Sequence, residues 1–212
     1  YILIKGEKAS ASRGVGKNLN DYLDEWNPDS LRYALASILP EQNDSEISED
    51  EMIRRNNEEL VAAWGNLVQR VFSQYINNFE NLEFDFELND VDKKIINEGN
   101  DCFEKTGELI EKVELKSSLQ SVMGYVNKIN AYLNETEPWK VIKEDSSRAT
   151  AILHTSLTAI EACASLFTPF MPTTSEIVKG AIEKNTNNNW SVNDIKKGAP
   201  LQDIGHLFKK FD

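Results

Sequence analysis

The fold is decided by residues 60–75, which read LVAAWGNLVQRVFSQY. Apolar residues recur in this stretch every three to four positions, the spacing of one face of an α-helix. They are Leu60, Trp64, Leu67, Val71 and Tyr75. The stretch therefore predicts an amphipathic helix whose apolar stripe is buried against other parts of the chain.

Two polar side chains flank this stripe. Asn66 and Arg70 are four residues apart, so they lie about 40° apart around the helix axis and share one face. A carboxamide beside a guanidinium is rich in hydrogen-bond donors, and such a pair can read the edge of a nucleobase or hold a phosphate. The same two residues also fit the solvated flank of an ordinary core helix. This helix alone leaves both interpretations open.

The rest of the chain continues the helical pattern. Ser48 with Glu51 forms a capping box that opens the long helix containing residues 60–75, and Thr173 with Glu176 forms a second capping box. Further helices are expected at residues 31–39, about 90–113 after an Asn89 cap, about 115–133, 146–167 and 173–184. Residues 146–167 are the most apolar and are expected at the centre. Long amphipathic helices with short loops predict an all-α fold, an antiparallel helix bundle.

The two ends of the chain have a different character. Residues 1–4 (YILI) predict a strand, and we take the first residue to be a boundary within a longer protein. Residues 6–16 form a loop rich in small residues, which is either a flexible turn or a phosphate-contacting loop. It is not a P-loop, because the GKS/T ending is missing. Residues 190–212 carry large apolar side chains without a period, which predicts a strap packed on the bundle.

The charge balance restricts the class of partner. The formal net charge of the 212 residues is −12. Such a charge argues against a general nucleic-acid binder, because phosphate contacts need local cations. It still allows a protein that recognises a few exposed bases through a small local patch, with weak non-specific binding.

Cysteine and histidine usage indicates neither a metal site nor a complete catalytic site. Cys102 and Cys163 stand far apart without a CxxC motif, which is typical of buried thiols in a reducing, cytoplasmic compartment. His154 lies on an apolar helix and is interpreted as a core histidine, while His206 lies in the tail. No Glu-x-x-His pair or nucleophile triad is present. No apolar run approaches the length of a membrane span, so no membrane partner is expected.

Trp139 is the second informative residue. It follows Pro138 at the end of a helix, where an aromatic ring can be held out rigidly, and Pro138 biases Glu137 toward an extended backbone. An exposed indole is a stacking platform for an unstacked base, worth about 1–3 kcal/mol per base. A tryptophan packed under a loop fits the same position.

Several motifs together resemble one family, methionyl-tRNA synthetase, a class I enzyme. The motifs occur in the family's order: GEKASASRG, YLDEWNPDSLRYALASILPEQNDSEIS, RRNNEELVAAWGNLVQR, NETEPW and FTPFMPTTSE. The resemblance covers nearly the whole chain and corresponds to the C-terminal half of the family. It implies three parts: the end of the catalytic domain with the stem-contact region (1–45), the anticodon-binding helix bundle (46–184) and a C-terminal strap (185–212).

The resemblance also implies a partner and a site. In the family, an Asn and an Arg of this helix and a Trp after a proline meet the CAU anticodon of methionine tRNA. Carried over, Asn66 and Arg70 hydrogen-bond to anticodon bases, Trp139 stacks on one of them, and Pro138 fixes the backbone that presents the indole. The parent enzyme is then a methionine-tRNA ligase that uses ATP.

The chain departs from the family at the mobile KMSKS loop, which here reads KASAS. Lys8, Ser10 and Ser12 match the loop, but Ala11 stands where a lysine holds the ATP phosphates in the transition state. The family's HIGH motif, nucleotide-binding sheet and methionine pocket are not in this sequence. We therefore expect this fragment alone to be inactive in methionine activation and to hold no cofactor.

Two alternatives remain at this point. The chain could be a helical protein-interaction module with no RNA role, or the bundle of another class I synthetase. An exposed surface shared by Asn66, Arg70 and Trp139 favours RNA recognition, whereas a Trp139 enclosed by apolar side chains favours the interaction module.

Overall fold

Helix α8, Ser146–Phe167, lies at the centre of the molecule. Its length and hydropathy would suffice to cross a membrane, but 94% of its most apolar window is buried against the rest of the chain. The computed structural model describes residues 2–4, 7–8, 18–41, 45–46, 48–185 and 189–212. Within these residues, the central position predicted for residues 146–167 is confirmed.

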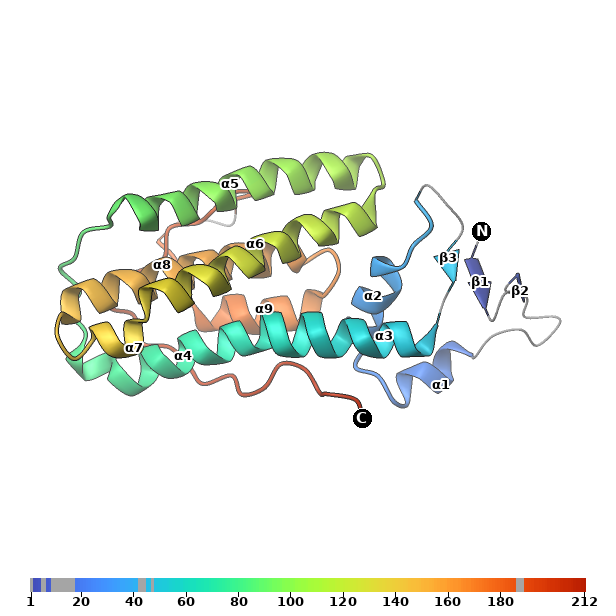
Figure 1. The fold of residues 1–212 in the computed structure, drawn as a ribbon, viewed down its shortest axis with the longest axis horizontal. Helices are drawn as coiled ribbons and strands as arrows, with labels where there is room; N and C mark the ends of the chain where they lie inside the picture. The colour runs from blue at the N-terminus through green and yellow to red at the C-terminus, as the bar shows by residue number, and fades with distance from the viewer. Residues whose placement is uncertain (1, 5–6, 9–17, 42–44, 47, 186–188) are drawn as a thin grey trace.

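Long helices pack around α8 as a bundle (Figure 1). Helices α5, Asp90–Glu111, and α6, Leu115–Thr136, run antiparallel and join through a tight turn at Val113, whose φ is 61°. The remaining bundle elements are α3 (Glu49–Arg55), η2 (Asn56–Gly65), α4 (Asn66–Asn78) and α9 (Pro172–Ala181). The prediction of an all-α bundle is therefore confirmed.

The long helix that carries residues 60–75 is not α-helical throughout. Between α3 and α4, the segment η2 is π-helical, so its turns are wider and its N–H groups bond five residues back. The stripe from Leu60 to Tyr75 is nevertheless buried, with no member more than 4% exposed. A continuous α-helix was expected because apolar spacings of three and four residues do not distinguish a short π-helical segment from α turns.

Two predicted helix starts are formed by local side chains. The Asn89 side chain accepts a hydrogen bond from Asp92 N at 3.0 Å, and Asp92 Oδ2 accepts one from Asn89 N at 3.0 Å, so α5 has a full capping box. Ser48 Oγ accepts from Glu51 N at 3.5 Å. The Glu51 carboxylate does not complete that box, because it binds the guanidinium groups of Arg54 and Arg55 instead.

The capping box predicted at Thr173 and Glu176 is wrong. Helix α9 begins at Pro172, so Thr173 already lies inside its first turn. Proline suits the first helical position because the N–H that it lacks has no helical acceptor there. The capping group comes from elsewhere in the fold: Asp29 Oδ2 accepts a hydrogen bond from Thr174 N at 2.6 Å. The helix also ends at Ala181, earlier than expected.

A small sheet forms at the N-terminal end. Strand β1, Ile2–Ile4, pairs antiparallel with β2, Glu7–Lys8, and parallel with β3, Ser45–Glu46. Leu3 lies opposite Lys8 in β2 and Glu46 in β3. The strand predicted at the start of the chain is therefore confirmed.

Two short helices lead from this sheet to the bundle, α1 (Leu19–Leu23) and α2 (Pro28–Ser37). Asn27 caps α2 by accepting a hydrogen bond from Asp29 N at 2.9 Å, as its sequence indicates. Tyr33 of α2 belongs to the main core and meets the Phe167 ring with centroids 6.3 Å apart. Helix α2 therefore packs directly on the bundle.

Helix α6 continues past its predicted end at Leu133. Its last residue is Thr136, and Glu137 then adopts a left-handed conformation with φ 41° and ψ 57°. The extended backbone predicted for Glu137 is wrong, because a left-handed residue closes the helix with a bond from Glu137 N to Leu133 O at 3.1 Å. Pro138 starts the next helix at once, α7, Pro138–Val141.

The loop between α4 and α5 opens with a 3₁₀ turn, η3, Phe79–Asn81. Phe86, further along this loop, is buried, and its ring lies 5.1 Å from the His154 imidazole. His154 is thus a core histidine, as predicted, and burial lowers its pKa to about 4.

The described residues of the C-terminal strap, 189–212, pack along the bundle (Figure 1). Tyr75 OH donates a hydrogen bond to Ala199 O at 3.0 Å, and Asn56 Nδ2 donates to Lys209 O at 2.9 Å. Further on, the ring of Phe211 lies 4.3 Å from that of Trp26. These contacts fix the strap along η2 and α4.

Candidate nucleic-acid interface

Two of the predicted site residues meet at one end of the bundle. The Arg70 guanidinium carbon, on α4, lies over the Trp139 ring, 5.3 Å from its centroid. Arg70 Nη2 also donates a hydrogen bond to Asn134 Oδ1 at 2.9 Å. A guanidinium on an aromatic ring is a cation–π contact, worth about 0.5–1 kcal/mol at an exposed site. Three separate elements therefore converge on one cluster.

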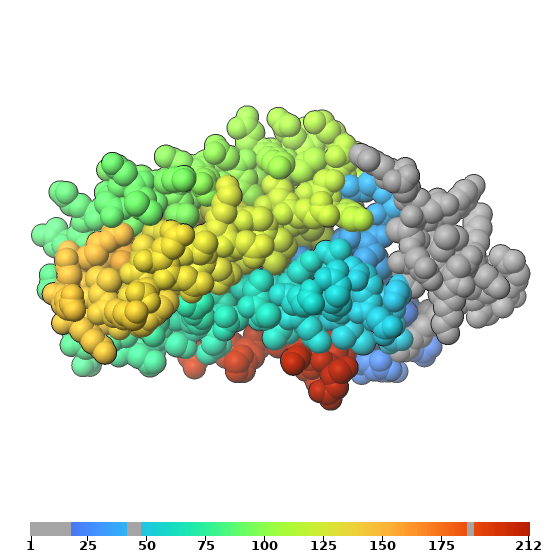
Figure 2. Space-filling model, viewed as in Figure 1, coloured from blue at the N-terminus to red at the C-terminus, as the bar shows by residue number. Residues whose placement is uncertain are grey.

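The Trp139 ring is neither fully exposed nor enclosed. Part of it packs against the main core, while the residue as a whole is half-buried. Pro138 beside it is buried and anchors the start of α7. Figure 2 shows the end of α6 and α7, in yellow to orange, at the surface next to α4. The indole is thus held by the fold and still reaches the surface.

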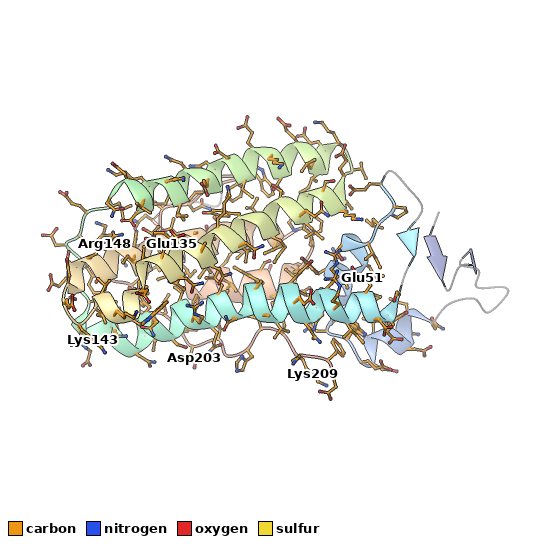
Figure 3. The ribbon with its side chains drawn as sticks, viewed as in Figure 1. Glu51, Glu135, Lys143, Arg148, Asp203 and Lys209 are labelled. Atoms are coloured by element: carbon orange, nitrogen blue, oxygen red, sulfur yellow. The ribbon has the colours of Figure 1, made fainter. Side chains whose placement is uncertain are left out.

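A buried ionic cluster ties together the helices on either side of α7. Tyr132 OH donates to Asp92 Oδ1 at 2.6 Å, and Arg148 Nη2 donates to the same oxygen at 2.9 Å. Burial raises the pKa of Asp92, but hydrogen bonds from Arg148 and Tyr132 outweigh it and lower the pKa below its usual value. Figure 3 labels Arg148 near this end of the bundle. The cluster fixes the corner from which Trp139 projects.

Asn66 lies one turn before Arg70 on α4, and its side chain is exposed. It has no hydrogen bond to Arg70 or Trp139; it borders a hollow between α4 and the strap instead. The structure therefore places Asn66 on the same helix as Arg70 but directs it to a neighbouring feature of the surface.

The role of Asn134 does not follow from its position in the sequence. Asn134 lies in the NETEPW motif, and the structure makes it the hydrogen-bond partner of Arg70. No spacing rule connects the two residues, which are separated by 64 positions. The sequence contained one signal. Arg70 lies in the same motif as Asn66, and Asn134 lies in the same motif as Trp139, so each is close to another residue predicted to bind a base.

This end of the bundle carries several cations, although the whole chain is acidic. Lys140 Nζ pairs with Glu137 Oε1 at 2.7 Å. Among the residues that the structure describes, Arg70 and Lys143 have no carboxylate partner. Both cations can therefore approach an external anion without first breaking an ion pair.

The loop residues predicted to contact ATP are not characterised by the structure. Lys8 is the last residue of β2, and nothing is described of its side chain. Ser10, Ala11 and Ser12 lie outside the described residues. Over the described ranges, no group of three His, Cys, Asp or Glu side chains could hold a metal ion.

Two family models match the chain, one after the other. The first, described as "tRNA synthetases class I (M)", covers residues 1–72. The second, described as "Anticodon binding domain of methionyl tRNA ligase", covers residues 85–212. Together they cover both the N-terminal segment and most of the bundle.

Curated relatives give the same result. A methionine–tRNA ligase from Chloroflexus aggregans is 39% identical over 176 residues, which are 83% of this chain and 29% of that relative. One from Corynebacterium glutamicum is 33% identical over 211 residues, 97% of this chain and 34% of the relative. The chain thus spans about a third of the length of the curated relatives it matches.

Solved structures agree in fold. A methionyl-tRNA synthetase from Mycobacterium tuberculosis, bound by methionyl-adenylate, superposes with a TM-score of 0.85 at 18% identity. The match covers 98% of this chain and 43% of that one. The apo form of the enzyme from the same organism gives a TM-score of 0.81 at 20% identity. At these identities the comparison establishes the fold.

Proposed function

Because the chain belongs to the methionyl-tRNA synthetase family, we propose that it recognises the CAU anticodon of methionine tRNA in support of an ATP-dependent methionine–tRNA ligase. The observation that carries this proposal is the contact of Arg70 with both Trp139 and Asn134 at one exposed end of the bundle. A stacking surface and a set of aimed N–H donors are the two components that single-stranded RNA recognition needs.

In this proposal the anticodon bases unstack on binding. One base stacks on the Trp139 indole, and its edge then faces the Arg70 guanidinium. Arg70 has five N–H donors and uses one of them on Asn134, so the others remain for the base. Asn66 contributes a carboxamide that can both donate and accept. A wrong base leaves these groups unpaired, which costs about 1–3 kcal/mol per contact.

The remaining parts of the chain are assigned on the same basis. We assign residues 1–45 to the end of the catalytic domain, 46–184 to the anticodon-binding bundle and 185–212 to the strap. Lys8, Ser10 and Ser12 belong to a KMSKS-like loop that serves ATP in the whole enzyme, with Ala11 in place of its lysine. The chain by itself does not activate methionine. The parent ligase works in the cytoplasm.

The interaction-module alternative is less well supported. It requires Trp139 to be enclosed by apolar side chains, whereas one side of the ring meets a guanidinium and the residue is half-buried. The bundle of another class I synthetase is disfavoured by the match of residues 85–212 to the methionyl domain.

Binding of anticodon stem-loops tests the proposal. The chain should bind a CAU stem-loop more tightly than one with a changed first base, and Trp139→Ala should weaken CAU binding about 5- to 150-fold, the equivalent of the stacking energy. Trp190→Ala is the matched control, because Trp190 is also surface-exposed, at 49%, but lies on the strap beside Phe103. Equal affinity for all anticodons would refute direct readout.

The whole enzyme provides a second measurement. There, Trp139→Ala should slow aminoacylation of methionine tRNA and leave ATP–pyrophosphate exchange nearly normal, because the indole contacts RNA and not the adenylate. Equal loss of both activities would indicate misfolding and count against a role in recognition.

A further inference from the structure

A second hollow, of about 250 Å³, opens between α5 and α6, which Figure 1 shows side by side. We call it the α5–α6 hollow. It is separate from the candidate interface, because Asn134 lies about 15 Å further along α6 than Gly124, which lines the hollow. The polar and charged residues of its rim are Glu98, Asp101 and Lys105 on α5 and Gln120 and Lys128 on α6.

Two contacts fix how the helices face each other along this hollow. Lys128 Nζ pairs with Glu98 Oε2 at 3.3 Å, and the Cys102 thiol donates to Ser121 O at 3.7 Å. On α6, Gly124 lies between these two contacts in sequence. Because the helices are antiparallel, Gly124 faces the turn of α5 between Glu98 and Cys102.

Packing inside the protein does not account for the glycine at position 124. In the same two helices, a Cβ at Gly99 would lie 2.6 Å from Tyr125 OH, and a Cβ at Gly107 would lie 3.0 Å from Trp190 Nε1. Those two glycines make room for neighbouring side chains. A Cβ at Gly124 would have no atom within 4 Å beyond its own stretch of helix. Because glycine is less favourable than alanine inside a helix, the space at Gly124 is left open at the expense of helix stability.

The floor of the hollow consists of two buried residues, Cys102 and Tyr125. Their polar atoms are already engaged: Tyr125 OH donates to Ile95 O at 3.0 Å, and the Cys102 thiol shares a hydrogen bond of 3.7 Å with Thr106 Oγ1. Burial raises the pKa of the Cys102 thiol, so the thiol is uncharged at neutral pH. The floor therefore offers an uncharged surface, and the rim must supply the polar recognition.

The rim carries two charges of opposite sign that are unpaired. Asp101 and Lys105 are exposed and share one face of α5, about 6 Å apart along its axis. Neither of them, nor the Gln120 carboxamide, has a hydrogen bond or ion pair with a side chain in the described part of the chain. Glu98 and Lys128 already neutralise each other. The hollow thus presents one carboxylate, one ammonium group and one carboxamide to an external ligand.

We propose that the α5–α6 hollow binds a small zwitterion of the α-amino acid class. The ammonium group of the ligand donates to the Asp101 carboxylate, its carboxylate accepts from Lys105 Nζ and the Gln120 amide, and its side chain lies over Gly124. A ligand with one charge leaves Asp101 or Lys105 without a partner. The volume also favours a small molecule, because sites for drug-sized ligands measure roughly 300–1,000 Å³. This site uses none of the residues proposed to bind RNA.

Titration of the isotope-labelled chain with free amino acids tests the site. The probes are glycine, L-alanine, L-methionine and L-phenylalanine, each added up to its solubility limit while the amide resonances are followed by NMR. At least one probe should shift the resonances of residues 101–105 and 120–128 saturably. The N-acetyl and methyl-ester derivatives of that probe should not, because each lacks one of the two charges. The absence of a saturable shift with all four probes would refute the proposal, and so would equal binding of the blocked derivatives.

Charge-removing variants locate the ligand. Lys105→Gln and Asp101→Asn should each weaken binding of the probe about 5-fold, the upper end of the range for one exposed ion pair. Lys94→Gln and Glu104→Gln are the matched controls, because both residues are exposed on α5 outside the hollow. They should bind the probe like the wild type. Unchanged binding by both Lys105→Gln and Asp101→Asn would show that the ligand is not held at this rim.

Filling the open space at Gly124 provides an independent test. Gly124→Leu should abolish binding of the probe, whereas Gly124→Ala should raise the urea midpoint of the chain, because alanine is the better helix former and meets no obstacle there. Circular dichroism checks that both variants fold, and both should bind a CAU stem-loop like the wild type. A folded Gly124→Leu variant that binds the probe as tightly as the wild type would overturn the proposal and leave the anticodon proposal untouched.

Discussion

Arg70 on α4 donates a hydrogen bond to Asn134 on α6 at 2.9 Å, and the same guanidinium lies over the Trp139 ring. Asn134 thus restricts a long, flexible side chain to one arrangement beside the indole. An arginine that is already ordered loses less conformational entropy when it binds a ligand. We infer that Asn134 is a positioning residue for Arg70.

Replacing Asn134 should therefore weaken RNA binding without weakening the fold. Asn134→Ala removes the acceptor for Arg70, and a lost hydrogen bond of this kind is worth about 0.5–1.5 kcal/mol, or about 2- to 10-fold in affinity for a CAU stem-loop. Alanine is a better helix former than asparagine, so the free energy of unfolding should not fall. Titration calorimetry and urea unfolding measure the two effects; Glu135→Ala, an exposed neighbour, is the control. Unchanged binding would contradict the positioning role.

The N-terminal segment supplies caps that bundle helices lack. Helices α9 and α6 have no side-chain cap of their own. Asp29 Oδ2 accepts from Thr174 N at 2.6 Å in α9, and Glu41 Oε2 accepts from Ser117 N at 3.3 Å at the start of α6. Two carboxylates thus join residues 18–41 to the bundle.

Asp29→Ala should lower the free energy of unfolding by about 1–3 kcal/mol, because Asp29 is 1% exposed and Thr174 N would be left buried without an acceptor. Glu41→Ala should have a smaller effect, since Glu41 is only half-buried and water can replace it. Urea unfolding followed by circular dichroism measures both. Asp24→Ala, at an exposed position, should be neutral. Equal, negligible effects of all three variants would show that the caps do not stabilise the bundle.

Removing one charge from the ionic cluster near α7 should lower stability more than removing both charges. Arg148→Met leaves Asp92, which is fully buried, without its main partner, and should destabilise the chain by about 3 kcal/mol. Adding Asp92→Asn to Arg148→Met removes the unpaired charge, so the double variant should recover part of the loss. Urea midpoints measure the series. A double variant less stable than Arg148→Met alone would contradict this explanation.

His154 predicts a loss of stability in acid. Burial lowers its pKa from 6.5 to about 4, with Lys197 lowering it further and Asp194 opposing the shift. Between pH 4 and pH 6.5, His154 binds a proton in the unfolded chain but not in the folded chain. The free energy of unfolding therefore falls as pH drops from 6.5 to 4. The loss at the end of this range is about 3 kcal/mol.

Urea unfolding at pH 7 and at pH 4.5 measures this slope. His154→Leu should flatten it, because leucine keeps the apolar contact with Phe86 and does not titrate. The same slope in His154→Leu as in the wild type would assign the acid sensitivity to other groups.

Much of the secondary structure follows from local sequence. The Asn89 cap and the helix at residues 146–167 were predicted correctly, because a cap and an apolar period depend on residues within a few positions of one another. Local sequence was misleading at Thr173 and Glu137. There the outcome depends on Asp29, a distant residue, and on the closing turn of α6.

The candidate site also combines features set by local sequence with features set by the tertiary structure. By itself, the sequence determined which helix faces are buried, that Asn66 and Arg70 share one side of a helix, and that Pro138 introduces a break before Trp139. Only the tertiary structure decided that Arg70 lies against Trp139 and Asn134, and that His206 comes to lie beside Asn66. Periodicity fixes the direction of a side chain around its own helix axis. Its partner on another element is set by how the whole core packs, which no short stretch of sequence contains.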